Sequence, residues 1–459
     1  MHPSQFVTLL CAVLALCGSG CRSRPQPIGD VIFVVVDTLR ADRLGRYGNE
    51  RGLTPFLDQL ADRGVRFDHA YAPSSWTVPS IASLFTSRLP SQHQVSTFDT
   101  RLSDADVTVA ERLSAAGYAA AGFTANFRLT AELGFAQGFP LWRGFINSPG
   151  SEPKARGEVL RAAALEWLDT PRQENAPKPP RLLYLQYMDT HAPFFPPQDP
   201  RARFAPRVSD EIARSANRKA TELFPTHDFS PQEEQALRDL YDAEVAGLDA
   251  ELRRLFEALE QRGILGTALV IVTSDHGEEF LEHGNVGHGY GLFNETVHVP
   301  LIIAGPGITA GVVSENVSLI DLAPTLLDLA GLPPEARFAG RSLAPLLRGA
   351  AGEAPTPDVL LQLLRNHKGW DLRTHVEGLV RGDQKLLIPK EEAFPPELFD
   401  LTADPAELKP NTVAAATQPL NDALAAAKAR LAAPAQPTAE RAVIDDATQE
   451  KLRALGYGH

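Results

Sequence analysis

Several short apolar runs, separated by helical patterns, constrain the fold of this chain more than any other feature. The first run, Val31–Val36, consists almost entirely of β-branched residues, which is typical of a strand buried on both faces of a parallel sheet. Further runs of this kind occupy Arg181–Tyr187 and residues 268–273 and 299–304. Between them lie helical patterns at residues 54–63 and Pro231–Gln261. The alternation predicts a doubly wound α/β sheet.

The composition changes near residue 350. Residues 350–357 are rich in Ala, Pro and Gly, residues 359–400 contain several short strand patterns, and residues 420–431 have a helical pattern. We therefore expect an α/β domain over residues 29–349. A smaller C-terminal α+β subdomain, with a small antiparallel sheet and helices, is expected over residues 350–459.

The N-terminus predicts export. The apolar run at residues 6–16 is shorter than the roughly 20 residues of a membrane-spanning helix, and small residues follow it, as in a cleaved signal peptide. Cys21 comes next and resembles the lipidated cysteine of a bacterial lipoprotein. We expect a signal peptide over residues 1–21 and a tether over residues 22–28. The exported protein is then a membrane-anchored lipoprotein or a periplasmic or extracellular protein, which meets a membrane only through a lipid on Cys21.

Charge and cysteine content exclude several classes of function. The chain has 44 Lys and Arg against 57 Asp and Glu, a formal net charge of −13, which argues against a nucleic-acid partner. Its three cysteines are Cys11, Cys17 and Cys21. Because all of them lie in the expected signal peptide, the rest of the chain has no disulfide, no cysteine metal ligand and no cysteine nucleophile.

Polar residues follow three of the expected strands. Asp37 follows the first run, Asp275 and His276 follow residues 268–273, and His191 comes shortly after Arg181–Tyr187. Ligands bind outside the carboxyl ends of the strands in open α/β sheets, and carboxylates with imidazoles suit a divalent metal. A single Asp at a strand end is more often a helix cap or an ion-pair partner. The combination favours a metal site.

Thr77 is the candidate nucleophile. It stands two residues before Pro79, in a segment that leads into a helical pattern. The N-terminus of a helix favours an anionic oxygen and an incoming phosphate or sulfate. The alternative interpretation is that Thr77 only caps this helix.

Taken in order, many segments of the chain resemble the motifs of the sulfatase family within the alkaline phosphatase superfamily. They include VIFVVVDTLRADRLGRYG, WTVPSIASLFTSRLP, YMDTHAPFFPP, SDHGEEFLEHG and HVPLIIAGPG. The resemblance covers most of residues 28–459. It implies an alkaline-phosphatase-like α/β/α sandwich with a smaller C-terminal subdomain. It also implies an ester hydrolase or phosphotransferase that acts on a sulfated or phosphorylated glycan, lipid or small molecule.

The resemblance also implies roles for individual residues. The metal positions are Asp37, Thr77, Asp275 and His276, and the catalytic positions are Thr77, His191 and His288. His191 and His288 also contact the substrate, whereas the neighbouring His283 has a weaker claim. Sulfatases often have a second Asp where this chain has Thr38, and calcium-dependent members commonly have Asn where it has His276. The expected single divalent ion is therefore Ca²⁺, Mn²⁺, Mg²⁺ or Zn²⁺.

The nucleophile segment departs most from the family. Sulfatases oxidise the Cys or Ser of a C/S-x-P-x-R motif to formylglycine, but here the matching residues are Thr77-Val78-Pro79-Ser80-Ile81. Both the convertible residue and the arginine are missing, so no formylglycine is expected. What remains resembles superfamily transferases and phosphodiesterases in which a metal-bound Thr attacks phosphorus directly.

Three functions are therefore compared. The favoured one is a metal-dependent hydrolase or transferase of phosphate esters with Thr77 as the nucleophile. The second is a sulfuric ester hydrolase with unconventional activation. The third is a catalytically silent anion-binding member of the fold. The third is disfavoured by the retained residues Asp37, Asp275, His276 and His191, because a silent site does not need a complete metal set.

Overall fold

The computed structural model describes residues 28–97, 99–145, 154–170, 178–222, 228–352, 356–364, 375–390 and 394–431. The expected signal peptide, nearly all of the tether and the chain beyond residue 431 lie outside these ranges. Within them, no helix combines the length and the apolar character that crossing a membrane requires.

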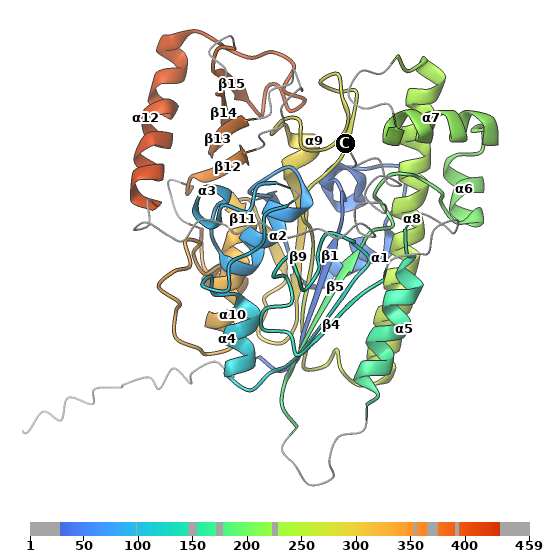
Figure 1. Ribbon diagram of the computed structural model, residues 1–459, viewed down its shortest axis with the longest axis vertical. Helices are drawn as coiled ribbons and strands as arrows, with labels where there is room; N and C mark the ends of the chain where they lie inside the picture. The colour runs from blue at the N-terminus through green and yellow to red at the C-terminus, as the bar shows by residue number, and fades with distance from the viewer. Residues whose placement is uncertain are drawn as a thin grey trace, which may run out of the picture.

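A nine-stranded mixed sheet forms the centre of the protein (Figure 1). Its order is β10-β2-β9-β6-β1-β5-β3-β4, and β11 pairs with β2. The strands are β1 (Val31–Val36), β2 (Val65–Tyr71), β3 (Ala119–Thr124), β4 (Leu141–Gly144), β5 (Arg181–Tyr187), β6 (Leu269–Ser274), β9 (His298–Ala304), β10 (Gly311–Val313) and β11 (Val317–Ser318). The central strands β1, β5 and β6 run parallel, as the sequence predicts.

Strand β9 runs antiparallel to both of its neighbours, β6 and β2. The connection from β6 to β9 contains only the short elements β7 (Glu279–Phe280), β8 (Val286–Gly287) and α9 (Asn294–Val297). No long crossover helix returns the chain to the other edge of the sheet, so β9 starts where β6 ends. The loop between them, residues 275–297, therefore stays at the carboxyl end of β6.

Helices cover both faces of the sheet, because the side chains of β1 alternate between two apolar cores. Phe33 packs in the core that also contains side chains of α2 (Thr77–Thr86), α4 (Val109–Ala115) and α10 (Leu322–Leu329). Val34 packs in the core with α1 (Pro55–Arg63), α5 (Gly157–Leu168) and α8 (Pro231–Gln261). The predicted α/β/α arrangement is confirmed.

A four-stranded antiparallel sheet forms the C-terminal subdomain beside the main sheet (Figure 1). Its strands are β12 (Val359–Leu364), β13 (His375–Arg381), β14 (Gln384–Pro389) and β15 (Glu397–Asp400), and α12 (Ala414–Leu431) packs on it. The expected strands and helix are thus present, while the exact domain boundaries stay predictions. The remaining helices are α3 (Pro90–His93), α6 (Gln198–Phe204), α7 (Asp210–Glu222) and α11 (Ala344–Leu347), with 3-10 turns at Ala41–Arg43, Gly45–Tyr47 and Leu319–Asp321.

Candidate active site

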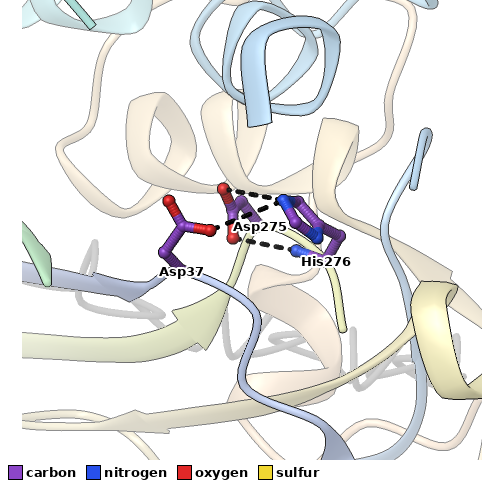
Figure 2. A group of neighbouring side chains, drawn as sticks. All are labelled: Asp37, Asp275 and His276. Carbon is purple, nitrogen blue, oxygen red and sulfur yellow. Dashed lines mark hydrogen bonds and ion pairs between the residues drawn. The ribbon is translucent and has the colours of Figure 1, made fainter. Parts of the chain in front are cut away.

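Asp37, Asp275 and His276 meet at the carboxyl ends of β1 and β6 (Figure 2). The parallel register aligns the last residue of β1 with Ser274, the last residue of β6, so the residues that follow emerge side by side. His276 Nε2 lies 3.6 Å from Asp37 Oδ1 and 3.6 Å from Asp275 Oδ2. All three side chains are fully buried. The structure thus brings together three of the predicted metal residues.

Thr77 completes this cluster. Its Oγ1 lies 3.1 Å from His276 Nε2 and donates to Asp37 Oδ2 over 3.5 Å. Thr77 is the first residue of α2, and the N-cap position belongs to Trp76, which makes no side-chain cap. The alternative that Thr77 only caps the helix is therefore wrong. Its hydroxyl faces the carboxylate and imidazole groups instead.

The backbone next to Asp37 has an unusual conformation. Thr38 has φ = 60°, in the left-handed region that β-branched residues rarely enter. Its N–H donates to Asp275 Oδ1 over 3.3 Å, and its carbonyl accepts from the Tyr241 hydroxyl at 2.7 Å. The next residue, Leu39, donates its N–H to Ser274 Oγ at 2.9 Å. These contacts hold a strained turn that fixes Asp37 beside Asp275.

The protonation state of His276 matches that of a metal ligand. Its Nδ1 lies 2.9 Å from the Gly277 carbonyl, which can only accept a hydrogen bond, so the proton sits on Nδ1 and Nε2 carries a lone pair. Burial and, to a smaller extent, the nearby His288 together lower the pKa of His276 to about 4. A neutral imidazole therefore presents its lone pair to two carboxylates.

This arrangement needs a cation. Burial raises the pKa of Asp275 to about 7, and burial together with the nearby Asp275 charge raises the pKa of Asp37 to about 6. Among the described residues, Asp37 Oδ1 has no hydrogen-bond partner. Buried charges are normally paired or coordinate a metal. The two carboxylates, the imidazole lone pair and the Thr77 hydroxyl therefore fit a divalent metal ion.

The two remaining predicted residues lie next to this cluster. The ring centroid of His288 is 4.4 Å from that of His276 and 5.1 Å from that of His191. The loop that carries His191 is fixed by Thr190 Oγ1, which donates to the Asp37 carbonyl at 2.5 Å, and by Lys154 Nζ, which donates to the His191 carbonyl at 2.6 Å. All six predicted site residues thus belong to one constellation.

Two residues of this constellation were not predicted from the sequence. Asn126 Nδ2 donates to Asp37 Oδ2 at 2.5 Å. It follows β3, whose AAAGFT sequence consists largely of small residues and lacks the apolar pattern of a buried strand. Glu278 accepts from His288 Nδ1 at 2.8 Å. Its only sequence signal is its position two residues after His276.

His283 belongs to a different group. Its Nδ1 lies 2.6 Å from Glu295 Oε1, and its Nε2 lies 3.1 Å from the carbonyl of Glu407 in the C-terminal subdomain. Burial lowers the pKa of His283, but the hydrogen bond and charge of Glu295 outweigh this effect and raise it to about 9. His283 is thus an ion-pair residue, in a group separate from Asp37, Asp275 and His276.

Family models agree with this geometry. The sulfatase model matches residues 29–332, and the N-sulphoglucosamine sulphohydrolase C-terminal model matches residues 282–433.

The chain belongs to the sulfatase family.

Membership confirms the resemblance found in the sequence motifs and identifies the protein as an ester hydrolase of the alkaline phosphatase superfamily. Proteins of the sulfatase family generally bind a divalent metal, and the group formed by Asp37, Asp275 and His276 is a possible site for one.

Curated relatives are sulfatases. The chain is 26% identical over 430 residues to a Delta 4,5-hexuronate-2-O-sulfatase of Bacteroides thetaiotaomicron, a match that covers 86% of each protein. It is 36% identical over 191 residues to arylsulfatase K of Gallus gallus, which covers 40% of this chain and 35% of the relative. The second match therefore spans only about a third of that relative's length.

Solved structures of similar fold include both sulfatase and phosphonate ester enzymes. A phosphonate monoester hydrolase of Agrobacterium radiobacter superposes with a TM-score of 0.73 at 22% identity, covering 88% of this chain and 96% of the other. A protein in complex with its substrate, D-glucosamine-2-N,6-O-disulfate, superposes with a TM-score of 0.69 at 19% identity, covering 87% and 96%. These similarities confirm the fold.

Proposed function

We propose that this sulfatase-family protein is a metal-dependent hydrolase or transferase of phosphate esters in which Thr77 attacks phosphorus directly. The observation that carries the proposal is the position of the Thr77 hydroxyl, within 3.1 Å of His276 Nε2 and 3.5 Å of Asp37 Oδ2. The chain also has no cysteine after Cys21 and has Ile81 where the family motif has Arg. Formylglycine chemistry therefore lacks its precursor, whereas a hydroxyl nucleophile stands in its place.

The chain's own residues support such an attack. Asp37, Asp275, His276 and Thr77 would hold the divalent metal, which lowers the pKa of a bound hydroxyl and polarises the ester. Thr77 Oγ1 donates to Asp37 Oδ2 and releases its proton in that direction, while Asn126 keeps this carboxylate in place. Because Thr77 begins α2, the positive end of the helix dipole stabilises the negative charge that develops there.

The reaction proceeds in two steps. In the first, Thr77 Oγ1 forms a bond to phosphorus, the bond from phosphorus to the leaving oxygen breaks, and that oxygen keeps the electron pair and takes a proton from His288 or His191. In the second step, water or an acceptor alcohol attacks phosphorus and gives its proton to the histidine that acted as the acid. The bond from phosphorus to Thr77 Oγ1 breaks, and Thr77 takes back the proton that it released toward Asp37. The two histidine rings, 5.1 Å apart, are placed to contact the charged oxygens in both steps.

A sulfuric ester hydrolase is the second candidate, because the family match and the relative from Bacteroides thetaiotaomicron are sulfatases. The substrate would then be a sulfated glycan, by analogy with the hexuronate-2-O-sulfatase and with the glucosamine disulfate bound by the structural relative. With Thr77 in place of formylglycine, such an enzyme would need a different route for activating its nucleophile. The two candidates therefore differ in how they depend on Thr77.

Replacing the nucleophile tests the proposal. Thr77→Ala should lower kcat/KM toward phosphodiesters by about a thousandfold or more, because no hydroxyl is then available to form the covalent phosphoryl intermediate. The wild type, Thr77→Ala and Asp275→Ala are assayed with aryl sulfate, phosphate monoester and phosphodiester panels. Mass spectrometry of rapidly quenched wild type should show one phosphoryl group on the peptide that contains Thr77.

Thr86→Ala is the matched control for this experiment. Thr86 is a buried threonine in the same helix, and its hydroxyl donates to the Ala82 carbonyl at 2.7 Å. This variant should keep the activity of the wild type. Sulfatase activity that survives Thr77→Ala would contradict the threonine mechanism. Absence of both bound metal and activity would favour the anion-binding function instead.

We also propose that the protein is exported and anchored through Cys21. The apolar run at residues 6–16 and the small residues before Cys21 support this proposal. Metabolic labelling with a lipid probe should mark the mature N-terminus, and Cys21→Ala should abolish the label. An unlabelled wild type that is recovered without membranes would contradict the anchor.

A further inference from the structure

Glu278 is a buried carboxylate beside the active site that belongs to no predicted ligand set. It is 1% exposed. Its Oε1 lies 2.8 Å from His288 Nδ1. Its Oε2 is buried and makes no hydrogen bond within the described ranges of the chain. The carboxylate is thus committed to a single side chain, that of His288.

The backbone around Glu278 is held from both sides. Its N–H donates to the Glu295 carbonyl at 3.0 Å, and its own carbonyl accepts from Arg40 Nη1 at 2.9 Å. The preceding residue, Gly277, approaches the same Glu295 carbonyl so closely that a Cβ there would lie 2.0 Å from the oxygen. These contacts leave the main chain little freedom, and the hydrogen bond to His288 holds the Glu278 side chain.

The hydrogen bond to Glu278 determines which nitrogen of His288 carries the proton. Burial raises the pKa of Glu278 to about 7, and the nearby imidazoles of His191 and His276 lower it. In its ionised form the carboxylate only accepts hydrogen bonds, so the proton of the pair then lies on Nδ1. Proton exchange with a substrate then takes place at Nε2, on the other side of the ring. Since the His288 ring lies 4.4 Å from the ring of His276, this exchange takes place beside the proposed nucleophile.

We propose that Glu278 is a positioning residue that keeps the His288 proton on Nδ1 and stabilises the imidazolium that protonates the leaving group. This inference rests on the proposed function. As the bond from Thr77 Oγ1 to phosphorus forms and the bond to the leaving oxygen breaks, the Nε2 proton passes to that oxygen. His288 is then neutral with its proton still on Nδ1, and Nε2 takes a proton from the attacking water in the second step.

The neighbouring Glu279 provides a matched control. It is equally buried, but its Oε1 accepts from the backbone N–H groups of His283 and Asn285, at 3.0 and 2.8 Å. Through these hydrogen bonds Glu279 stabilises the turn, whereas Glu278 pairs with the His288 ring. Substitutions at positions 278 and 279 remove the same chemical group from the same segment, with different consequences for His288.

The tautomer can be measured without any assay of activity. In nitrogen-15 NMR spectra of the full chain with labelled histidine, the signals of His288 are those missing from His288→Gln. These signals should show the proton on Nδ1 in the wild type and in Glu279→Gln. Glu278→Gln should show the same, because its amide keeps an acceptor oxygen. Glu278→Ala should lose this preference. A wild-type proton on Nε2, or an unchanged tautomer in Glu278→Ala, would overturn the proposal.

The kinetic test compares leaving groups. Protonation matters most for poor leaving groups, and general acid catalysis contributes roughly a hundredfold or more. Glu278→Ala should therefore lower kcat/KM, which reports the first step alone, by about a hundredfold for alkyl phosphodiesters and by less than about tenfold for p-nitrophenyl esters. Glu278→Gln should lie between the wild type and Glu278→Ala.

These outcomes separate the two levels of inference. An equal loss of activity for all leaving groups would overturn the positioning role and leave the threonine mechanism intact. A wild type that turns over no phosphate ester would instead contradict the proposed function, and with it the role of Glu278 in catalysis. Circular dichroism and melting temperatures show whether each variant is folded. If Glu278→Ala does not fold, Glu278→Gln still tests the proposal.

Discussion

Two clusters lie near the loop of residues 275–297, and each consists of two carboxylates and one histidine. They differ in the hydrogen bonding and in the pKa of the histidine. They are Asp37, Asp275 and His276 in the first group and Glu279, His283 and Glu295 in the second. In the first, His276 donates only from Nδ1, and burial lowers its pKa to about 4. In the second, both nitrogens of His283 face acceptors, and Glu295 raises its pKa to about 9 against the effect of burial.

The comparison shows that residue types alone do not define a metal site. The second group already contains its cation, because the His283 imidazolium pairs with Glu295, and a metal would have to displace its protons. In the first group the lone pair on His276 Nε2 faces the two carboxylates. All three groups are electron donors, so the first group has no cation of its own. The state of the hydrogen bonds, and not the count of carboxylates, separates a ligand set from an ion pair.

The second group has a structural role. His283 donates to the Glu407 carbonyl, and Lys385 Nζ lies 2.8 Å from Glu407 Oε1 and 3.0 Å from Asn294 Oδ1. Lys385 and Glu407 are buried. These contacts join the loop that carries His288 to the C-terminal subdomain. The two groups thus divide the loop into a part beside the proposed metal site and an anchoring part.

Metal content provides the strongest test of this comparison. Asp275→Asn should abolish stoichiometric metal binding and lower kcat/KM by about a thousandfold or more, since metal chemistry contributes several kcal/mol to such reactions. Glu295→Gln should keep the metal. Elemental analysis of the purified variants, together with assays on the best phosphate ester, checks both statements. Loss of the metal in Glu295→Gln as well would show that the second group also binds an ion.

The melting temperature should also depend on the metal ion, although this effect is smaller than the loss of activity. A ligand that binds only the folded state stabilises it by about 2.7 kcal/mol at a hundredfold excess over its Kd. Removing the metal with a chelator should therefore lower the melting temperature of the wild type and of Glu295→Gln, and adding Mn²⁺ or Zn²⁺ should restore it. Asp275→Asn should not respond. An equal response in Asp275→Asn would place the stabilising ion outside the first group.

The sequence predicts the fold and all three residues of the first group because strong patterns encode them. The run Val31–Val36 and residues 268–273 mark two buried parallel strands, and Asp37, Asp275 and His276 follow from the ends of these strands. Parallel register then brings them together, which is a local consequence of strand pairing.

The remaining features depend on tertiary contacts that no local pattern encodes. The sequence does not indicate Asn126, because β3, which precedes it, consists largely of small residues and lacks the apolar pattern that predicts a buried strand. The role of Glu278 depends on the close approach of Gly277 to the Glu295 carbonyl, 18 residues further along the chain. The antiparallel direction of β9 depends on the absence of a crossover helix, which a list of apolar runs does not show.

The pH dependence of stability offers the smallest and most specific test. In the folded protein the His283 pKa is about 9, above the ordinary value of 6.5, so its protonated form is favoured by folding. This contribution is fully present below about pH 6.5 and is lost as the pH rises through about 9. His283→Gln should therefore lower the melting temperature by a few degrees at pH 6 and have almost no effect at pH 9.5.

The difference between wild type and variant isolates His283 from every other titrating group. The effect should be modest because the residue is partly exposed and solvent screens its pair with Glu295. A metal ion in the second group would reverse the sign: His283 would then have to be neutral, and its contribution would grow as the pH rises. Melting curves of both proteins from pH 6 to pH 9.5 therefore decide whether this histidine is an anchoring cation or a second metal ligand.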